Sequence, residues 1–166
     1  FPPPYNNRVN RLLHHAIEEI RNDVETAIAR YGAERIAVCM GSCDNGSEES
    51  QHALGVRQQT GAFPPGYTLE QQRADLPARF TAWSLGTTGP CISYSTACAS
   101  SASALVSARA LILSGQCDAA VAGGADIVSD AVALGFGALE AVSGEPCNPF
   151  SANRNGISLG EAAALF

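Results

Sequence analysis

The sequence contains no lysine, and all ten of its basic residues are arginine. Lysine chemistry is therefore excluded from these 166 residues, both Schiff-base catalysis and the lysine of a phosphate-binding loop. Charged residues make up only 16% of the chain, against about 25% in a typical soluble domain. The net charge of −6, without a basic stripe, argues against nucleic acid or an anionic membrane as a partner.

Long apolar runs are absent as well, since no run reaches the roughly 18 residues that a membrane span requires. The first five residues, FPPPY, have neither the basic nor the apolar region of a signal peptide. Hydrophobic residues nevertheless make up 46% of the chain, which is too many for a disordered protein and enough for a buried core. We therefore expect a folded, cytoplasmic domain.

The six cysteines form no CxxC pair, and the three histidines do not stand at zinc-ligand spacings from them. The cysteines are Cys39, Cys43, Cys91, Cys98, Cys117 and Cys147. A chain of this size and apolar content does not need disulfides for stability. We expect a reducing compartment, no bound metal, and mostly buried, inert thiols. Cys98 is the exception.

Short apolar segments alternate with alanine-rich helical patterns along the chain. Strands are expected at 35–41, 91–96 and 118–124, and a further strand begins at 157. Helices are expected from a cap at Asn7 or Asn10 to about Arg30, and at 51–59, 69–85, 99–113 and 127–136. The alternation predicts a layered α/β fold with a mainly buried sheet. Because about four strands would leave apolar sheet edges open, we expect a piece of a larger domain.

The most informative segment runs from Cys91 to Ala102 and reads CISYSTACASSA. It places Cys98 where a predicted strand passes into a predicted helix, between small neighbours. Such a turn pushes its central side chain outward, as in the nucleophile elbow of hydrolases. Positive charge at the helix N-terminus favours the nucleophilic thiolate, and the Cys98 amide is available to an oxyanion. The alternative interpretation is a small buried cysteine without a chemical role.

Several motifs in register resemble the β-ketoacyl-acyl-carrier-protein synthases, the condensing enzymes of the thiolase-like fold. Gly89-Pro90 and Ser95–Ser100 (STACAS) resemble the family's nucleophile motif, and residues 104–118 resemble the helix that follows it. The later matches are 122–124 (AGG), 135–143 (GFGALEAVS) and 149–161 (PFSANRNGISLGE). The resemblance spans about residues 30–166. It implies a thiolase-like layered α/β/α/β/α fold, of which this chain would be an incomplete N-terminal half.

The resemblance implies decarboxylative Claisen condensation, in which Cys98 takes an acyl group from an acyl carrier protein and a malonyl thioester then attacks it. Cys98 would be the nucleophile, and its backbone N–H one oxyanion donor. The implied substrate-binding residues are Phe136 and Thr96 near the nucleophile, and Cys43 and Asp44 at the acyl-pocket wall beside the partner subunit. An acidic Asp44 there would suit a short, polar or aryl-type acyl chain. No cofactor is implied.

Two residues depart from the family pattern, since Asn155 and Ser151 stand where the family has aspartate. We expect these changes to affect loop hydrogen bonding more than chemistry. The family's two active-site histidines, its lysine and a Gly-Phe-Gly-rich loop are expected beyond residue 166, and its first strand and helix before Phe1. Residues 1–166 are thus expected to be part of one N-terminal ketosynthase domain. Residues 91–97 would pair across the two-fold axis of a dimer.

Several functions remain open from the sequence. The first is an elongating ketosynthase of fatty-acid or polyketide synthesis, in a homodimer or heterodimer, and the loop at 143–147 would fit an aryl-polyene pathway. The second is a non-catalytic partner subunit like a chain-length factor, although such partners generally lack the cysteine found at Cys98. A thiolase or chalcone-type synthase is disfavoured by the segment at 154–161. The last is an α/β domain without activity.

Overall fold

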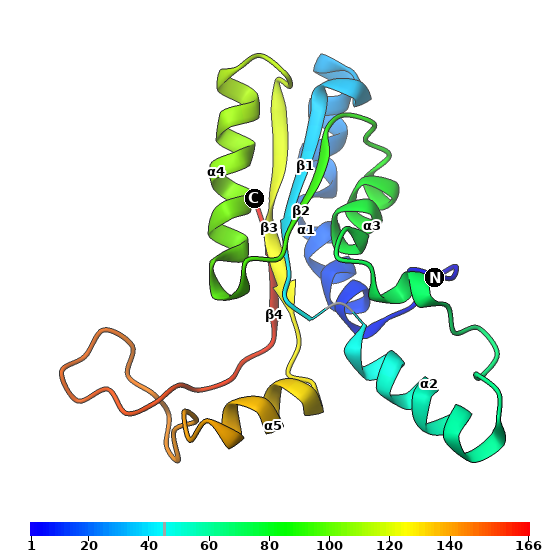
Figure 1. Cartoon of the computed structure of the whole chain (residues 1–166). Coiled ribbons are helices and arrows are strands. Elements are labelled where there is room, and N and C mark those ends of the chain that lie inside the picture. The colour runs from blue at the N-terminus through cyan, green and yellow to red at the C-terminus, as the bar shows by residue number, and fades with distance from the viewer. Residues whose placement is uncertain (45) are drawn as a thin grey trace.

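The computed structural model describes residues 1–44 and 46–166. The α-helices within these ranges are α1 (Arg8–Tyr31), α2 (Ser47–Thr60), α3 (Leu76–Leu85), α4 (Ser100–Leu113) and α5 (Asp130–Ala138). The strands are β1 (Ile36–Gly41), β2 (Cys91–Tyr94), β3 (Ala119–Asp126) and β4 (Ala162–Leu165). Short 3-10 helices are η1 (Ala33–Arg35), η2 (Leu69–Gln72) and η3 (Ala97–Ala99). The predicted alternation of strands and helices is therefore confirmed (Figure 1).

The four strands form one sheet in the order β2-β1-β3-β4. β1 lies between β2 and β3 and is parallel to both, with Val38 opposite Cys91 on one side and Val121 on the other. β4 is antiparallel to β3. Because β2, β1 and β3 run in the same direction, their carboxyl ends meet at one edge of the sheet, at the lower end of the strands in Figure 1. In α/β sheets, functional residues gather in the loops at this edge.

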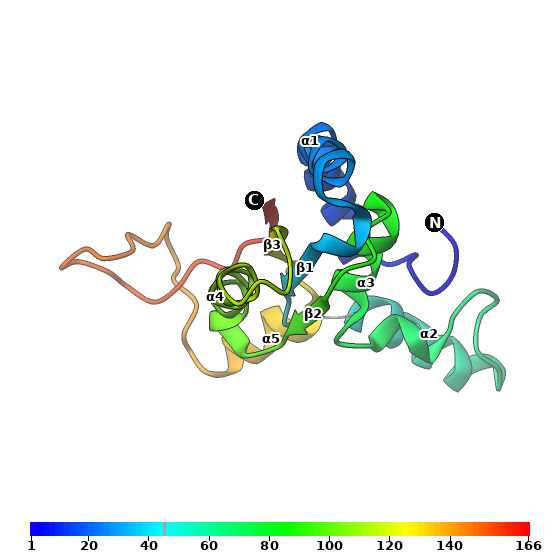
Figure 2. The same ribbon diagram turned by 90° about the horizontal axis from the view of Figure 1, so that it is seen from above.

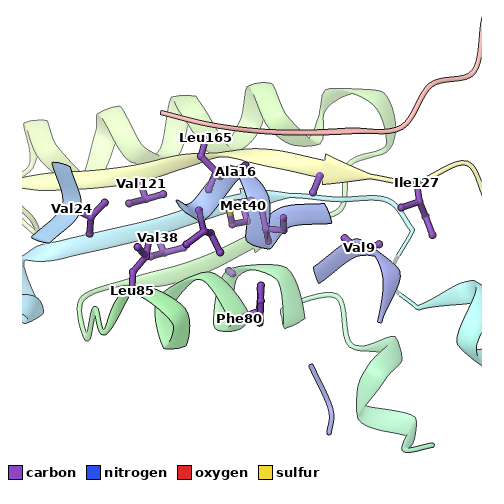
Figure 3. Packing of buried hydrophobic residues seen from close by; sticks show 14 residues of the cluster. Val9, Ala16, Val24, Val38, Met40, Phe80, Leu85, Val121, Ile127 and Leu165 are labelled. Carbon is purple, nitrogen blue, oxygen red and sulfur yellow. The ribbon is translucent and has the colours of Figure 1, made fainter. Parts of the chain in front are cut away.

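Helices cover both faces of the sheet, with α1 and α3 on one side and α4 on the other (Figure 2). The side chains of β1 alternate between these faces because the strand period is two. Val38 and Met40 point into the larger cluster, which Figure 3 shows between β1, β3, α1 and α3, with Phe80 on α3. Ala37 and Cys39 point to the other side. The sheet thus carries large side chains toward α1 and α3.

The α4 side of the sheet is lined by small residues. Its buried cluster consists of Ala37, Cys39, Ala104, Ala108, Leu111, Cys117 and Ala122. Small side chains on both surfaces allow the helix to lie close to the strands. The outer surface of α4 carries exposed apolar residues, among them Val106 and Leu113.

The structure corrects several predicted boundaries. The expected helix at 69–85 is divided into η2 and α3, with Pro77 at the start of α3. Proline is accepted in the first turn of a helix but would break its interior. The strand expected from Ile157 is confined to β4, and Ile157 forms only an isolated bridge with Val142. The expected helix at 51–59 begins earlier, at Ser47, whose N–H donates to Oδ1 of Asp44 and which follows the N-cap residue Gly46.

The expectation of mostly buried thiols is wrong. All six cysteines are free, but only Cys39 and Cys117 are buried. Burial raises the pKa of both of these thiols. The exposed cysteines are Cys43, Cys91 and Cys98, and Cys147 is intermediate. They lie on the edge strand β2 and in loops, which the layers of this chain do not cover.

Candidate active site

Cys98 lies in a sharp turn between β2 and α4, as the sequence predicts. The chain leaves β2 after Tyr94, forms η3 at Ala97–Ala99 and enters α4 at Ser100. Ala97 has a φ of 52°, in the left-handed region that residues other than glycine rarely adopt. Strained backbone of this kind clusters at active sites, where the surrounding structure holds it in place. The side chain of Cys98 itself is exposed.

Ser100 holds this turn together from the first residue of α4. Its Oγ accepts the backbone N–H of Thr96 at 2.9 Å and donates to the carbonyl oxygen of Ala97 at 2.6 Å. The Thr96 hydroxyl lies 3.2 Å from the hydroxyl of Ser103, one turn further along α4. Ser100 is only 2% exposed, so these bonds are shielded from water. Ser100, which follows Cys98, thus fixes the conformation of the two residues that precede Cys98.

Two glycines allow the turn to lie directly over the ends of the strands. Gly41 is the last residue of β1, and it pairs with Gly124, which lies two residues before the end of β3. A Cβ on Gly41 would lie 2.3 Å from the backbone carbon of Ser100, and one on Gly124 would lie 2.1 Å from the Oγ of Ser101. Real Cβ contacts are never this short. Glycine is therefore required at both positions for the first turn of α4 to take this place.

A loop after β1 packs against the same turn. Oδ1 of Asp126, at the end of β3, accepts hydrogen bonds from Ser42 Oγ at 3.2 Å, Cys43 N at 2.7 Å and Asp44 N at 3.1 Å. The loop places Cys43 so that its Sγ donates to the carbonyl oxygen of Ala97 at 2.9 Å. Three loop residues are thus tied to one carboxylate, and one of them contacts the turn that bears Cys98.

The predicted site residues fall into two groups. Cys98, Thr96 and Cys43 come together in one hydrogen-bonded turn. Asp44 lies in the loop beside them, but it is buried and its Oδ1 accepts the N–H of Ser47 at the start of α2. Phe136 lies on α5, half-buried and outside these hydrogen bonds. The roles of Thr96, Cys43, Asp44 and Phe136 in substrate binding, and that of Cys98 in catalysis, stay predictions.

Sequence reasoning missed Asp126, Ser100 and the glycine pair Gly41 and Gly124. A usable signal was present for the glycines, because both end predicted apolar strands at the same sheet edge. Asp126 is the second residue after the predicted strand at 118–124, at the sheet edge where side chains from neighbouring loops meet. Ser100 resembles an ordinary residue of a serine-rich helix, and only the structure shows its two bonds.

The arrangement suits a nucleophile that attacks a carbonyl carbon. The first N–H groups of a helix have no acceptor within it. Here the N–H of Ala99 donates to Thr96 and that of Ser100 to Ala97, so the amide of Cys98 precedes the first bonded donors. The thiol also lies at the N-terminal end of the 14-residue helix α4, where the helix dipole favours negative charge.

Other types of site find less support. Within residues 1–44 and 46–166, no three His, Cys, Asp or Glu side chains form a group able to hold a metal ion. His14 and His15 lie on α1 and His52 lies on α2, away from the turn of Cys98 along the chain. No helix in the described part of the chain is long and apolar enough to cross a membrane.

Comparison with known proteins identifies the family. A sequence model described as the N-terminal domain of β-ketoacyl synthases matches residues 6–166. Nodulation protein E of Rhizobium meliloti is 28% identical over 160 residues, which are 96% of this chain and 40% of that protein. A non-reducing polyketide synthase of Aspergillus terreus (strain NIH 2624 / FGSC A1156) is 40% identical over 83 residues, 48% of this chain and 3% of that protein.

The fold agrees with solved structures of the same type. A chain from the complex of a ketosynthase with its chain length factor, from Xenorhabdus doucetiae, is 43% identical with a TM-score of 0.86, over 97% of this chain and 41% of that chain. The chain therefore spans less than half the length of this structure and of the nodulation protein. The match nevertheless covers nearly all of the chain and includes the strand, turn and helix around Cys98. The resemblance seen in the sequence is confirmed: the chain belongs to the β-ketoacyl synthase family and corresponds to its N-terminal domain.

Proposed function

We propose that Cys98 is the nucleophile of a decarboxylative condensation that yields a 3-oxoacyl thioester. The Cys98 thiolate attacks the carbonyl carbon of an acyl-carrier-protein thioester, and the carrier thiol leaves with a proton. A malonyl thioester then loses CO₂, and its α-carbon attacks the acyl group on Cys98. The C–S bond to Cys98 breaks and the thiolate is regenerated. The observation that carries this proposal is the exposed thiol on a strained strand-to-helix turn.

The geometry supports two roles for this residue. The side chain is directed away from the buried layers, which gives a carrier-bound substrate access to it. The backbone amide of Cys98 is one donor to the oxyanion that forms when the acyl carbon becomes tetrahedral. A positioned donor of this kind contributes about 10²- to 10³-fold to the rate in other acyl-transfer enzymes.

For the assembled protein, we infer a dimer with a second ketosynthase-type chain. The Xenorhabdus structure is a complex of a ketosynthase with its chain length factor, which supports a heterodimer. The presence of Cys98 favours the catalytic chain of such a pair over the non-catalytic one. β2 is an edge strand of the sheet in this chain and offers unpaired backbone groups to a partner. The six free cysteines support a reducing compartment such as the cytoplasm.

The proposal is tested by acylation of the full-length protein. Incubation with an acyl-carrier-protein thioester is expected to add one acyl group to the peptide that contains Cys98, as measured by mass spectrometry. Cys98→Ala removes this adduct and abolishes condensation. Cys147→Ala is the matched control, because Cys147 is also a free thiol but lies in the loop between α5 and β4, away from β2 and from the N-terminus of α4. Acylation of another cysteine, or none on Cys98, would overturn the assignment and favour a non-catalytic subunit.

A further inference from the structure

Cys43 is the only thiol of this chain, all of whose cysteines are described, that bonds to the turn carrying Cys98. Its Sγ lies 2.9 Å from the carbonyl oxygen of Ala97 and 3.4 Å from the Oγ of Ser100. The same carbonyl oxygen also accepts the hydroxyl and the backbone N–H of Ser100. Two of these three donors belong to the turn itself. Cys43 is the one that comes from a different loop.

We propose that Cys43 is a positioning residue that holds the strained turn in the conformation presenting Cys98. Its thiol fixes the direction of the Ala97 carbonyl, and so the peptide plane that leads into Cys98. A left-handed alanine persists only when its surroundings hold it there. Without the bond from Cys43, only Ser100 still holds the Ala97 carbonyl, so the peptide can shift and the thiol of Cys98 and its amide lose their fixed relation. The effect on turnover rests on the proposed function, whereas the effect on the turn does not.

Cys43 is able to act in this way because it is itself held. The Asp126 carboxylate accepts the backbone N–H of Cys43 at 2.7 Å, and also binds Ser42 and Asp44. Hydrogen bonds to a charged acceptor are about twice as strong as those between neutral groups. A continuous chain of bonds thus runs from the end of β3, through the loop after β1, to the turn between β2 and α4. These segments meet at the carboxyl edge of the sheet in Figure 1.

The proton needed for this bond stays on Cys43. Loss of water around the thiol raises its pKa, and the nearby charges of Asp126, Cys98 and Asp44 raise it further, whereas the bond to Ser100 lowers it. At neutral pH Cys43 is therefore a neutral S–H donor. A neutral thiol beside Cys98 also avoids the repulsion that two neighbouring thiolates would have. Although both side chains are exposed, Cys43 thus acts as a neutral hydrogen-bond donor and Cys98 as the nucleophile.

The test uses the full-length protein with Cys43→Ala and Cys43→Ser. Alkylation of Cys98 by iodoacetamide is followed by mass spectrometry of its peptide from pH 6 to pH 9, and condensation is measured in parallel. Cys43→Ala is expected to slow alkylation of Cys98 about tenfold, which corresponds to one net hydrogen bond. In condensation, kcat falls by a similar factor and KM changes little. Cys43→Ser retains an O–H donor and is expected to restore both rates to within about threefold of wild type.

Cys147→Ala is the matched control, because the Cys147 thiol also donates to a backbone carbonyl, that of Gly156, at 3.3 Å in a separate loop. It should leave Cys98 unaffected. Circular dichroism identifies variants that do not fold, and Cys43→Ser decides the outcome if Cys43→Ala is among them. Wild-type alkylation in Cys43→Ala, or a Cys43→Ser variant as slow as Cys43→Ala, would overturn the proposal. Alkylation requires no acyl substrate, so it decides this question even if condensation is absent.

Discussion

Gly41→Ala tests the contact between the end of β1 and the start of α4. The added Cβ would lie 2.3 Å from the backbone carbon of Ser100, 2.4 Å from the nitrogen of Ser101 and 2.6 Å from the oxygen of Ser100. All three atoms are backbone, so no side chain can rotate away. Ordinary contact begins at 3.4 Å. The two backbones must therefore separate by about 1.1 Å, the difference between 3.4 and 2.3 Å.

Two magnitudes follow from this displacement. Overpacking of this kind costs about 1–3 kcal/mol of the free energy of unfolding. A misplacement of about 1 Å at an active site costs up to roughly 10²-fold in rate. Since Ser100 bonds to both Thr96 and Ala97, its movement carries the whole turn with it. We expect a large loss of condensation together with a moderate loss of stability.

The assay combines urea unfolding with acylation and alkylation of Cys98 in the full-length protein. Gly55→Ala is the matched control, because Gly55 lies inside α2 with nothing within 4 Å of an added Cβ. There the change should be neutral or add up to about 1 kcal/mol of stability, since alanine is the better helix former. A Gly41→Ala protein with wild-type stability and wild-type Cys98 reactivity would refute the close packing of β1 against α4.

Three smaller predictions concern single interactions. Ser100→Ala removes the bonds of a buried hydroxyl to Thr96, Ala97 and Cys43 and should destabilise the protein by about 1–3 kcal/mol in urea unfolding, whereas an unchanged midpoint would mean that these bonds contribute nothing. Asn7 accepts the N–H of Asn10 at 2.8 Å and caps α1, so Asn7→Ala should cost about 0.5–2 kcal/mol while Asn7→Ser retains most of the stability. Arg35 holds the pKa of Asp118 below its usual value by a hydrogen bond, so the stabilisation from Asp118 is present above about pH 4 and is lost as pH falls through the lowered pKa. Asp118→Asn should remove this part of the pH dependence between neutral and acidic pH, and an identical pH profile in the variant would contradict the assignment.

Much of the fold could be predicted because its cause is local. The apolar strands at 36–41 and 119–126, the cap at Asn7 and the long amphipathic α1 follow from side-chain pattern alone. The division of 69–85 into two helices also has a local cause. Pro77 is accepted in the first turn of α3 but not inside a longer helix, although the apolar periodicity alone predicts one helix. The exposure of the thiols was not predictable, because it depends on which layers of the fold cover them.

The proposed nucleophile of the candidate site could be predicted from the sequence, whereas the residues that hydrogen-bond to its turn could not. Cys98 could be found because a strand-to-helix junction with small neighbours is visible in one short segment. Cys43 was named for a different reason, as part of an acyl-pocket wall, and its bond to Ala97 joins residues more than fifty positions apart. Asp126 was not named at all. Contacts between loops are set by the strand order β2-β1-β3, which no local pattern encodes.

The unequal size of the side chains on the two faces of β1 has a consequence for how this domain tolerates change. Val38 and Met40 lie in a layer of larger residues under α1 and α3, where close packing makes an altered volume costly to stability. Ala37 and Cys39 lie under α4, so we expect added volume there to displace this helix, whose first residue, Ser100, holds the turn before Cys98. We therefore expect substitutions toward α1 and α3 to change the melting temperature first, and substitutions toward α4 to change the reactivity of Cys98 as well.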